Sequence, residues 1–169
     1  MNEVAPAGPR LIRTVLTAEV PDVAALHARA RATYRPDGPP DDGTDWPAAW
    51  REAVERTDGQ VLCAVERGRL AAVASFRSPR GGDPRTVALH QFHVDPHRWR
   101  TGIGTALHIA CVEMWRADGR HTAVLDVRAD NRRARAFYAH QGWVPDEGHS
   151  PAADGHHLRL RLPLLPAGR

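Results

Sequence analysis

A stretch of glycine and basic residues near the middle of the chain has the composition of an anion-binding loop. An apolar run that begins near Val87 stops at Asp95-Pro96, and the loop Arg98-Trp-Arg-Thr-Gly-Ile-Gly-Thr105 follows. From Gly102 the apolar residues recur at helical spacing, so the loop is predicted to join a strand to a helix. The first N–H groups of a helix have no intrahelical partner, and the helix dipole favours negative charge there. The pattern therefore predicts a site for a phosphate or a pyrophosphate.

Two common phosphate-binding motifs differ from this loop. A P-loop requires a Lys followed by Ser or Thr after its glycines, and no such pair follows Gly102 and Gly104. A dinucleotide fingerprint requires a third glycine and an opening strand–helix–strand unit, which the sequence lacks here. For the loop taken alone, the alternative is a tight strand-to-helix turn that binds nothing.

Composition indicates an ordinary globular protein. The 169 residues are 42% hydrophobic and 25% charged, which is enough chain to bury a proper core. We expect a flexible lead-in over residues 1–9 and a single domain over residues 10–169. The net charge of +3 is spread along the chain, which argues against nucleic acid as a partner.

Targeting signals are not recognisable in the sequence. No apolar run approaches the roughly 18 residues that a membrane span needs, and the first residues lack a hydrophobic signal core. Cys63 and Cys111 lie inside apolar runs and are predicted to be buried, reduced thiols rather than a disulfide. We therefore expect a cytoplasmic protein that does not bind membranes.

The hydrophobic pattern predicts a mixed α/β sheet with helices on both of its faces. The glycine loop would lie at the carboxyl end of its strand, where ligands bind in open α/β sheets. Strands are predicted near residues 11–16, 60–66, 69–77, 86–94, 121–128, 143–144 and 158–164. Helices are predicted near residues 17–34, 45–56, 102–119 and 130–138.

A second group of residues, after the next strand, extends the motif. Asn131 is followed by the pair Phe137-Tyr138 and then by Gly142-Trp143. Together with the glycine loop, this order resembles the GNAT superfamily of acyl-CoA-dependent N-acyltransferases. That family carries a Gln/Arg-x-x-Gly-x-Gly/Ala cofactor signature, and the matching core covers residues 86–143.

The resemblance implies the GNAT fold and acetyl-CoA as cosubstrate, without a metal. That fold is a twisted, mostly antiparallel sheet of about seven strands flanked by four helices, with a V-shaped splay between the fourth and fifth strands. The first signature position falls on Trp99, whose neighbours are basic, so backbone N–H groups would carry the pyrophosphate. The residues expected to bind the cofactor are Phe92, Val94, Arg98, Arg100, Thr101, Gly102, Ile103, Gly104, Thr105, Asn131 and Phe137.

Transfer of an acyl group from a thioester to an amine requires an uncharged amine, a stabilised oxyanion and a proton for the departing thiolate. By resemblance, the Val94 N–H polarises the thioester carbonyl and Tyr138 protonates the thiolate. A phenol with a pKa of about 10 suits a thiol of about 8.5. The alternative for Tyr138 is an aromatic residue of the core.

A histidine is the candidate general base. Leu89-His-Gln-Phe-His-Val94 resembles the segment that places a catalytic histidine in the serotonin-acetyltransferase-like branch. His90 lies two alternations before Val94, so the two side chains are expected to share a face of the strand. Because histidine titrates near neutral pH, His90 could accept the proton of the amine. The alternative is a hydrogen-bonded histidine in the cleft wall.

The other histidines are expected to be structural. His93 has the opposite parity to His90 along the strand. A metal site built from His90, His93 and His97 is not expected, because two of them would point to opposite faces and no cysteine or carboxylate completes a ligand set. The pair His156-His157 suggests no metal site either.

The acceptor pocket of this architecture is formed by the first two helices, the loop that joins them and the later hairpin. The aromatic residues there are Tyr34, Trp46 and Trp50, and the acidic ones are Asp37, Asp41, Asp42 and Asp45. Aromatic rings beside carboxylates would suit a cationic or aromatic amine. The alternative is a solvated loop with the tryptophans packed beneath it.

Two functions follow. The first is transfer of an acetyl group from acetyl-CoA to a primary amine of a small molecule, or to a peptide or protein amino group, by direct attack in a ternary complex. The second is a non-catalytic acyl-CoA-binding module for sensing or assembly. His90 and Tyr138 favour the enzyme, because a silent module has no need of either. The expected partner is an amine substrate, and a homodimer is left open.

Overall fold

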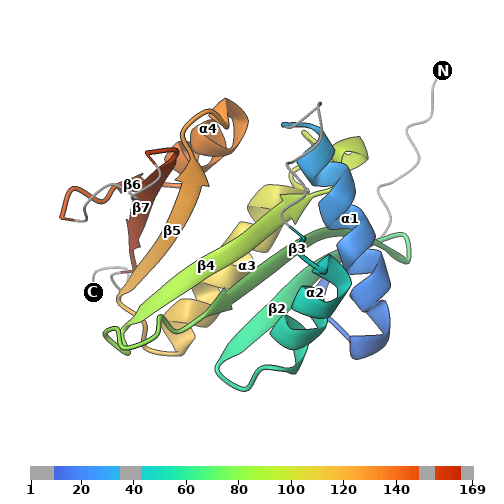
Figure 1. Cartoon of the computed structure of the whole chain (residues 1–169), viewed down its shortest axis with the longest axis horizontal. Coiled ribbons are helices and arrows are strands. Elements are labelled where there is room, and N and C mark those ends of the chain that lie inside the picture. The colour runs from blue at the N-terminus through green and yellow to red at the C-terminus, as the bar shows by residue number, and fades with distance from the viewer. Residues whose placement is uncertain (1–9, 35–42, 149–154, 165–169) are drawn as a thin grey trace.

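Over the residues that the computed structural model describes (10–34, 43–148 and 155–164), seven strands form one sheet and four α-helices cover its faces (Figure 1). The strands are β1 (Arg10–Thr14), β2 (Gly59–Glu66), β3 (Arg69–Arg77), β4 (Thr86–Val94), β5 (Thr122–Arg128), β6 (Val144–Pro145) and β7 (His157–Pro163). The helices are α1 (Val20–Ala32), α2 (Trp46–Glu55), α3 (Ile103–Ala117) and α4 (Arg132–His140), with short 3-10 turns η1 (Thr17–Glu19) and η2 (Pro96–Arg98). The predicted lead-in over residues 1–9 and the acidic residues Asp37, Asp41 and Asp42 lie outside the described residues.

The sheet has the order β1-β2-β3-β4-β5-β7-β6, and it splits between its two central strands. All neighbours are antiparallel except β4 and β5, which are parallel and pair only over Thr86–Ala88 and Thr122–Val124. Beyond Ala88, β4 stays with β3 while β5 stays with β7. Figure 1 shows the resulting V between them. The predicted mixed fold and the splay are confirmed.

Each face of the sheet has its own core. On one face, Ile103, Leu107 and Trp115 of α3 pack on Phe76 and Leu125 in one buried cluster. On the other face, the helices α1 and α2 bury a second cluster, whose members are Val15, Val20, Val23, Leu26, Trp50, Val61, Cys63 and Val73. The two cysteines are free and buried, one in each cluster, as their apolar surroundings predicted.

A β-bulge at His90 changes which side chains face the split end of β4. Gln91 lies opposite Ser75, but Leu89 lies opposite the next residue, Phe76, so His90 is an extra residue. The alternation of side chains is therefore reset across the bulge.

The reset places the side chains of β4 on two different faces. Phe92 and Val94 pack with the α3 core, whereas His93 lies opposite Val73, a residue of the α1/α2 core. His90 lines a cavity beside α2. The prediction that His90 and Val94 share a face is wrong, because it assumed a regular strand.

The backbone of β4 faces the split at alternate residues. The Asp95 N–H donates to the Ala71 carbonyl at 2.8 Å, and Val94 lies opposite Ala72 in the antiparallel ladder. Hydrogen-bonded positions alternate in such a ladder, so the backbone groups of Phe92 and Val94 point away from β3. They therefore face the side on which β5 has diverged.

Among the described helices, none combines the length and the apolar composition that crossing a bilayer requires.

Candidate active site

The glycine loop turns sharply into α3. Arg100 and Gly102 have positive φ angles of 63° and 83°, a left-handed conformation that glycine adopts at little cost. The first backbone N–H of α3 that forms a helical hydrogen bond is that of Ala106, which donates to the Gly102 carbonyl at 3.0 Å. The N–H groups before it have no acceptor within the helix. The loop therefore presents backbone donors at the positive end of α3.

Gly104 keeps the start of the helix close to its neighbours. A Cβ at this position would lie 3.2 Å from Val94 Cγ2 and 3.6 Å from the ring of Phe137. A larger side chain would fill the space between the loop, β4 and α4. This narrow cradle, with its backbone donors, fits the diphosphate and the extended arm of an acyl-CoA.

Two arginines hold the loop in place through one buried carboxylate. Glu66, only 5% exposed, accepts from Arg98 Nη1 at 3.1 Å and from Arg10 Nε at 3.0 Å. Arg10 also donates to the Thr101 carbonyl, and the Thr101 hydroxyl donates to the Arg98 carbonyl at 2.6 Å. Arg98 thus shares the carboxylate of Glu66 with Arg10, and its side chain braces the loop.

Sequence reasoning missed one cation beside the loop. The guanidinium carbon of Arg133 lies 3.2 Å from the centroid of the Trp99 ring. Burial, and then the positive charge of Arg100, lower the pKa of Arg133. Trp99, the residue that departs from the family signature, thus positions an arginine of α4. The available signal was the pair of arginines that directly follows Asn131.

A cavity of about 430 Å³, here called the loop cavity, lies between the glycine loop, β4 and α4. All the predicted cofactor residues line it except Thr101. The Thr101 carbonyl accepts from Arg10, and its hydroxyl donates to the Arg98 carbonyl. Asn131 also caps α4, since its side chain accepts from the Ala134 N–H at 3.1 Å. The structure therefore brings the predicted cofactor set together.

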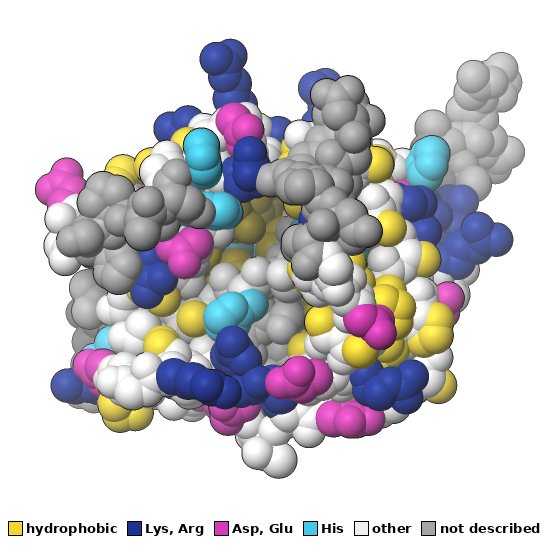
Figure 2. Space-filling view, viewed as in Figure 1, with side chains coloured by type: hydrophobic (Ala, Val, Ile, Leu, Met, Phe, Trp, Pro, Cys, Tyr) yellow, Lys and Arg dark blue, Asp and Glu magenta, His cyan; other side chains and the backbone are white. Residues whose placement is uncertain are grey.

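A second cavity of about 390 Å³, here called the histidine cavity, adjoins the first. Its wall includes His27, Arg31, His90, Gln91 and Asp126. Figure 2 shows this face of the molecule hollowed near its centre, with histidine side chains at the rim. The residues that line both cavities are Tyr34, Phe92, His93, Asn131, Ala134 and Tyr138. We call this shared wall the junction.

Tyr138 is a buried member of the junction. It is 8% exposed and packs against the rings of Phe92, Phe137 and Trp143. Burial, and then the neighbouring Cys111 and Tyr34, raise the pKa of Tyr138. The phenol therefore keeps its proton at neutral pH and can act as an acid or a hydrogen-bond donor.

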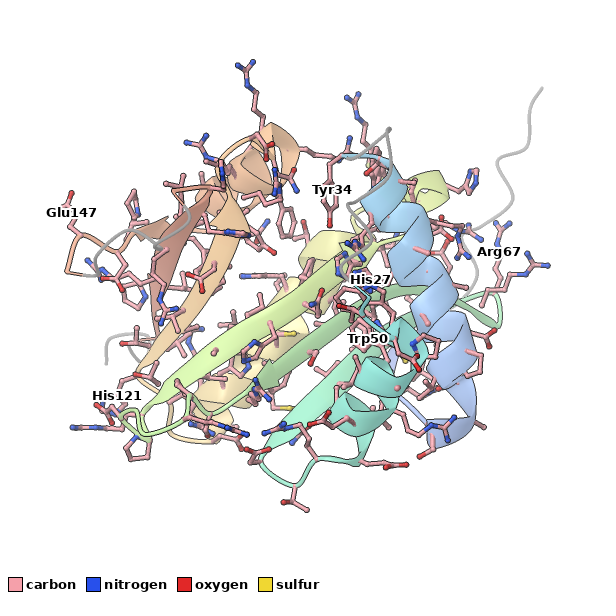
Figure 3. The ribbon with its side chains drawn as sticks, in the orientation of Figure 1. His27, Tyr34, Trp50, Arg67, His121 and Glu147 are labelled. Atoms are coloured by element: carbon pink, nitrogen blue, oxygen red, sulfur yellow. The ribbon has the colours of Figure 1, made fainter. Side chains whose placement is uncertain are left out.

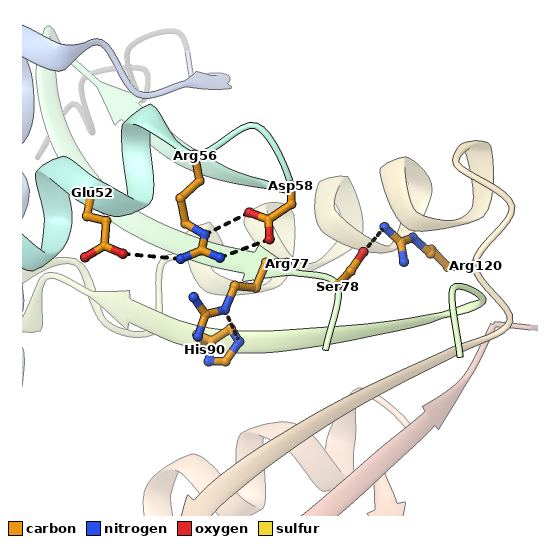
Figure 4. A network of polar contacts seen from close by, with 7 residues as sticks. All are labelled: Glu52, Arg56, Asp58, Arg77, Ser78, His90 and Arg120. Carbon is orange, nitrogen blue, oxygen red and sulfur yellow. Dashed lines mark hydrogen bonds and ion pairs between the residues drawn. The ribbon is translucent and has the colours of Figure 1, made fainter. Parts of the chain in front are cut away.

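Two histidines of β4 reach the histidine cavity from different ends. His90 Nε2 accepts from Arg77 Nε at 3.0 Å, next to the Glu52–Arg56–Asp58 ion pairs (Figure 4). It also lines a smaller cavity of about 150 Å³ beside α2, but not the loop cavity. Burial and then Arg77 lower the pKa of His90.

His93, predicted to be structural, lies at the junction. Its Nε2 is 2.7 Å from Gln91 Oε1, and its ring stacks on His27 with 4.2 Å between centroids. Burial, then His27 and Arg31, lower the pKa of His93 well below its usual value. The imidazole is therefore neutral at physiological pH, as a general base must be. The bulge at His90 puts the His93 side chain on this face of the sheet, and no local sequence pattern indicates a bulge.

The predicted acceptor residues divide between site and core. Tyr34 lies at the junction, between α1 and α4 (Figure 3), and Trp46 lines the histidine cavity. Trp50 is 2% exposed, and its Nε1–H donates to His27 Nδ1 at 3.1 Å beneath α1. Trp50 is thus a core residue that orients His27, which agrees with the alternative interpretation. Asp45 caps α2, since its side chain accepts from the Ala48 N–H.

Among the described residues, no group of three or more His, Cys, Asp and Glu side chains is arranged to hold a metal ion.

Comparison with known proteins places this site in a family. A sequence model of the Acetyltransferase (GNAT) family matches residues 24–143. The chain therefore belongs to the GNAT acetyltransferase family. The mycothiol acetyltransferase of Beutenbergia cavernae is 31% identical over 147 residues, covering 86% of this chain and 48% of that protein. The chain thus spans about half the length of this curated relative.

Solved structures share the fold at low sequence identity. The ribosomal-protein-S18-alanine N-acetyltransferase of Escherichia coli superposes with a TM-score of 0.73 at 23% identity, covering 95% of this chain and 97% of that one. The PaiA N-acetyltransferase of Thermoplasma acidophilum, in complex with coenzyme A, gives a TM-score of 0.75 at 13% identity, covering 92% and 99%.

Proposed function

We propose that this protein transfers an acetyl group from acetyl-CoA to a primary amine of a small molecule, or to a peptide or protein amino group. The observation that carries the proposal is the junction. There the loop cavity meets the histidine cavity, and a buried phenol and a neutral imidazole stand on the shared wall. A purely binding module needs the first cavity only. The cytoplasmic location and the homodimer stay predictions.

The loop cavity would hold the cofactor, which supplies an acetyl thioester when bound. The N–H groups at the start of α3 would bind the pyrophosphate, with Arg100 and Arg133 as the nearby cations. The free backbone groups of Phe92 and Val94 would hold the extended arm as an added strand. The Val94 N–H would then donate to the thioester carbonyl, where negative charge develops.

Two side chains would carry out the two proton transfers of the reaction. Tyr138 would give its proton to the sulfur atom as the carbon–sulfur bond breaks, since burial keeps the phenol protonated at neutral pH. A neutral histidine accepts the proton that the attacking amine loses. His90 is the candidate from the sequence, and His93 is the candidate from the geometry of the junction.

Release of free thiol from acetyl-CoA, measured against a panel of amines, tests the proposed reaction. We expect Tyr138→Phe to lower kcat by about 100-fold or more while the Kd for CoA stays within about 3-fold. Tyr34→Phe, the matched change at the other tyrosine of the junction, should alter KM more than kcat. If CoA binds but no amine accelerates thiol release, the sensing module is the better interpretation.

Calorimetric titration with CoA tests the loop cavity. Because a side chain at position 104 would press on Val94 and Phe137, Gly104→Val should weaken CoA binding by at least about 10-fold, or about 1.4 kcal/mol. Ala136→Val adds the same side chain on the exposed face of α4 and should leave affinity unchanged. A wild-type protein that binds no CoA would contradict the enzyme and the sensing module together.

A further inference from the structure

The histidine cavity contains a positive charge that no carboxylate of the described residues balances. Arg31, on α1, is half-buried in the cavity wall, and its guanidinium carbon lies 4.8 Å from the centroid of the Trp46 ring. Its described contacts are to this ring, and no ion pair holds it within the described part of the chain.

The other charges on this wall have partners. Asp126 accepts from Arg159 Nη1 at 3.1 Å, and Arg128 Nη2 donates to Asp130 at 2.8 Å. Arg31 is therefore the uncompensated charge among the described residues of the wall.

Three histidines of the wall, His27, His90 and His93, have lowered pKa values and add no counter-charge. Burial, and then the charge of Arg31, lower the pKa of His27 to about 4. Burial, then His27 and Arg31, lower the pKa of His93, and burial and then Arg77 lower the pKa of His90. Gln91 and Tyr34 carry no charge at neutral pH. Among the described residues, the net charge at the α1 end of the wall is therefore positive.

Of the four aspartates predicted beside this pocket, Asp45 is the one that lies in the described part of the chain. Asp45 serves the N-terminus of α2, and the other three aspartates lie outside the described residues. A half-buried guanidinium that pairs with none of the described carboxylates favours an anionic ligand, and its planar pair of donors matches a carboxylate.

We propose that the histidine cavity takes an acceptor that carries a carboxylate as well as its amine, and that Arg31 binds this carboxylate. The proposal rests on the proposed function, because it assigns the histidine cavity to the acceptor. The amine would then lie at the junction, between Tyr138 and His93, while the carboxylate lies against Arg31 and Trp46. A cavity of about 390 Å³ suits an amino acid or the end of a short peptide.

Matched acceptors test the carboxylate directly. Phenylalanine is compared with phenethylamine, and alanyl-phenylalanine with its C-terminal amide, so that the two arms distinguish a free amino acid from a peptide terminus. In the wild type, we expect kcat/KM to be at least about 10-fold higher for the carboxylate member of one pair. Arg31→Gln should lower kcat/KM about 10- to 100-fold for that member and leave its uncharged partner within about 3-fold.

The matched control is Arg51→Gln, which removes an exposed guanidinium from α2 and should change neither member of a pair. Arg31→Lys keeps the charge but loses the planar donors, and it should recover part of the preference. Circular dichroism and the Kd for CoA identify a variant that has lost its fold.

Binding to the CoA-loaded protein gives a readout without turnover. N-acetyl-phenylalanine should bind more tightly than N-acetyl-phenethylamine, and Arg31→Gln should abolish the difference. Turnover without any carboxylate preference would overturn the inference and leave the proposed function intact. Arg31-dependent binding without turnover of any amine would support the carboxylate site and contradict the proposed function. Absence of both the binding and the preference would overturn the carboxylate site.

Discussion

At the scale of single residues, burial pushes the pKa values of an acid and a base apart at one place. Tyr138 has a raised pKa and His93 a lowered one, and both stand on the wall shared by the two cavities. Pairs of groups whose environments separate their pKa values commonly mark acid and base roles. At neutral pH this pair therefore holds a proton to give and a lone pair to accept one.

Replacement of each β4 histidine by glutamine separates the two candidates for the base. Because His93 lies at the junction and His90 does not, His93→Gln should lower kcat/KM by about 100-fold and His90→Gln by less than about 10-fold. The groups that face His93 are His27 and Arg31 from α1, and Tyr138 shares its cavities. A larger loss in His90→Gln would restore the assignment made from the sequence.

The pH dependence of kcat/KM in the wild type and in His93→Gln tests the same assignment. A base acts in its neutral form, so activity is present above its pKa and is lost as pH falls through it. Since the pKa of His93 lies below its usual value of about 6.5, the acid limb of kcat/KM should lie below pH 6.5 in the wild type and vanish in His93→Gln. The titration of the amine itself lies at higher pH. An unchanged acid limb in His93→Gln would exclude this histidine as the base.

The sequence could predict those site residues whose role depends on local backbone chemistry. Gly102, Gly104 and Asn131 are recognisable because a left-handed turn, a close approach and a helix cap each demand particular residues. The places of His93 and Arg133 depend on how distant strands and helices come together. No spacing within a segment contains that information.

At the scale of elements, β4 is the strand from which the site is built. It pairs with β5 over three residues and then leaves one edge open, while a bulge redirects its side chains. Hydrophobic periodicity predicted β4 and its neighbours well, because alternation and helical spacing are local signals. The bulge was not predictable, because it belongs to the register between β3 and β4.

A proline at position 94 tests the open edge of β4. Val94→Pro removes one N–H that does not bond β3, so the ladder should survive while the proposed donor to the thioester carbonyl is lost. We expect kcat to fall by about 100-fold or more, with the Kd for CoA changed by less than about 10-fold. Val94→Ala keeps the N–H and loses only the side chain, so its kcat should stay within about 3-fold of the wild type. Equal losses in the two variants would show that the side chain matters instead.

At the scale of the whole molecule, buried neutral histidines couple stability to pH. His27 and His108 are 2% and 3% exposed, and burial lowers the pKa of each to about 4. Each accepts a hydrogen bond from a tryptophan, His27 from Trp50 and His108 from Trp143. In the unfolded chain both histidines take up protons near pH 6.5, whereas in the folded protein they do not.

Acid should therefore destabilise the fold well above the range in which carboxylates titrate. The unfolded state binds more protons below pH 6.5, so the free energy of unfolding falls as pH drops from 6.5 towards 4, by about 3 kcal/mol at most for each histidine. Urea titrations at pH 7.5 and pH 5 measure this loss. His108→Gln, which keeps an acceptor for Trp143, should lower stability at pH 7.5 but show a smaller loss on acidification. An identical loss in the variant would contradict the role of His108.

On the proposed function, the bulge at His90 also separates the groups of β4 that would select the acceptor from those that would bind the acyl donor. Odd-numbered side chains beyond it, Gln91 and His93, line the cavity proposed for the acceptor, whereas the backbone of Phe92 and Val94 faces the gap proposed for the acyl donor. Main-chain contacts tolerate almost any sequence, so substitutions at Gln91, or across the cavity at Arg31, can change acceptor preference at little cost in donor affinity. Directed evolution towards a new amine should therefore accumulate its changes at such positions and spare the glycine loop.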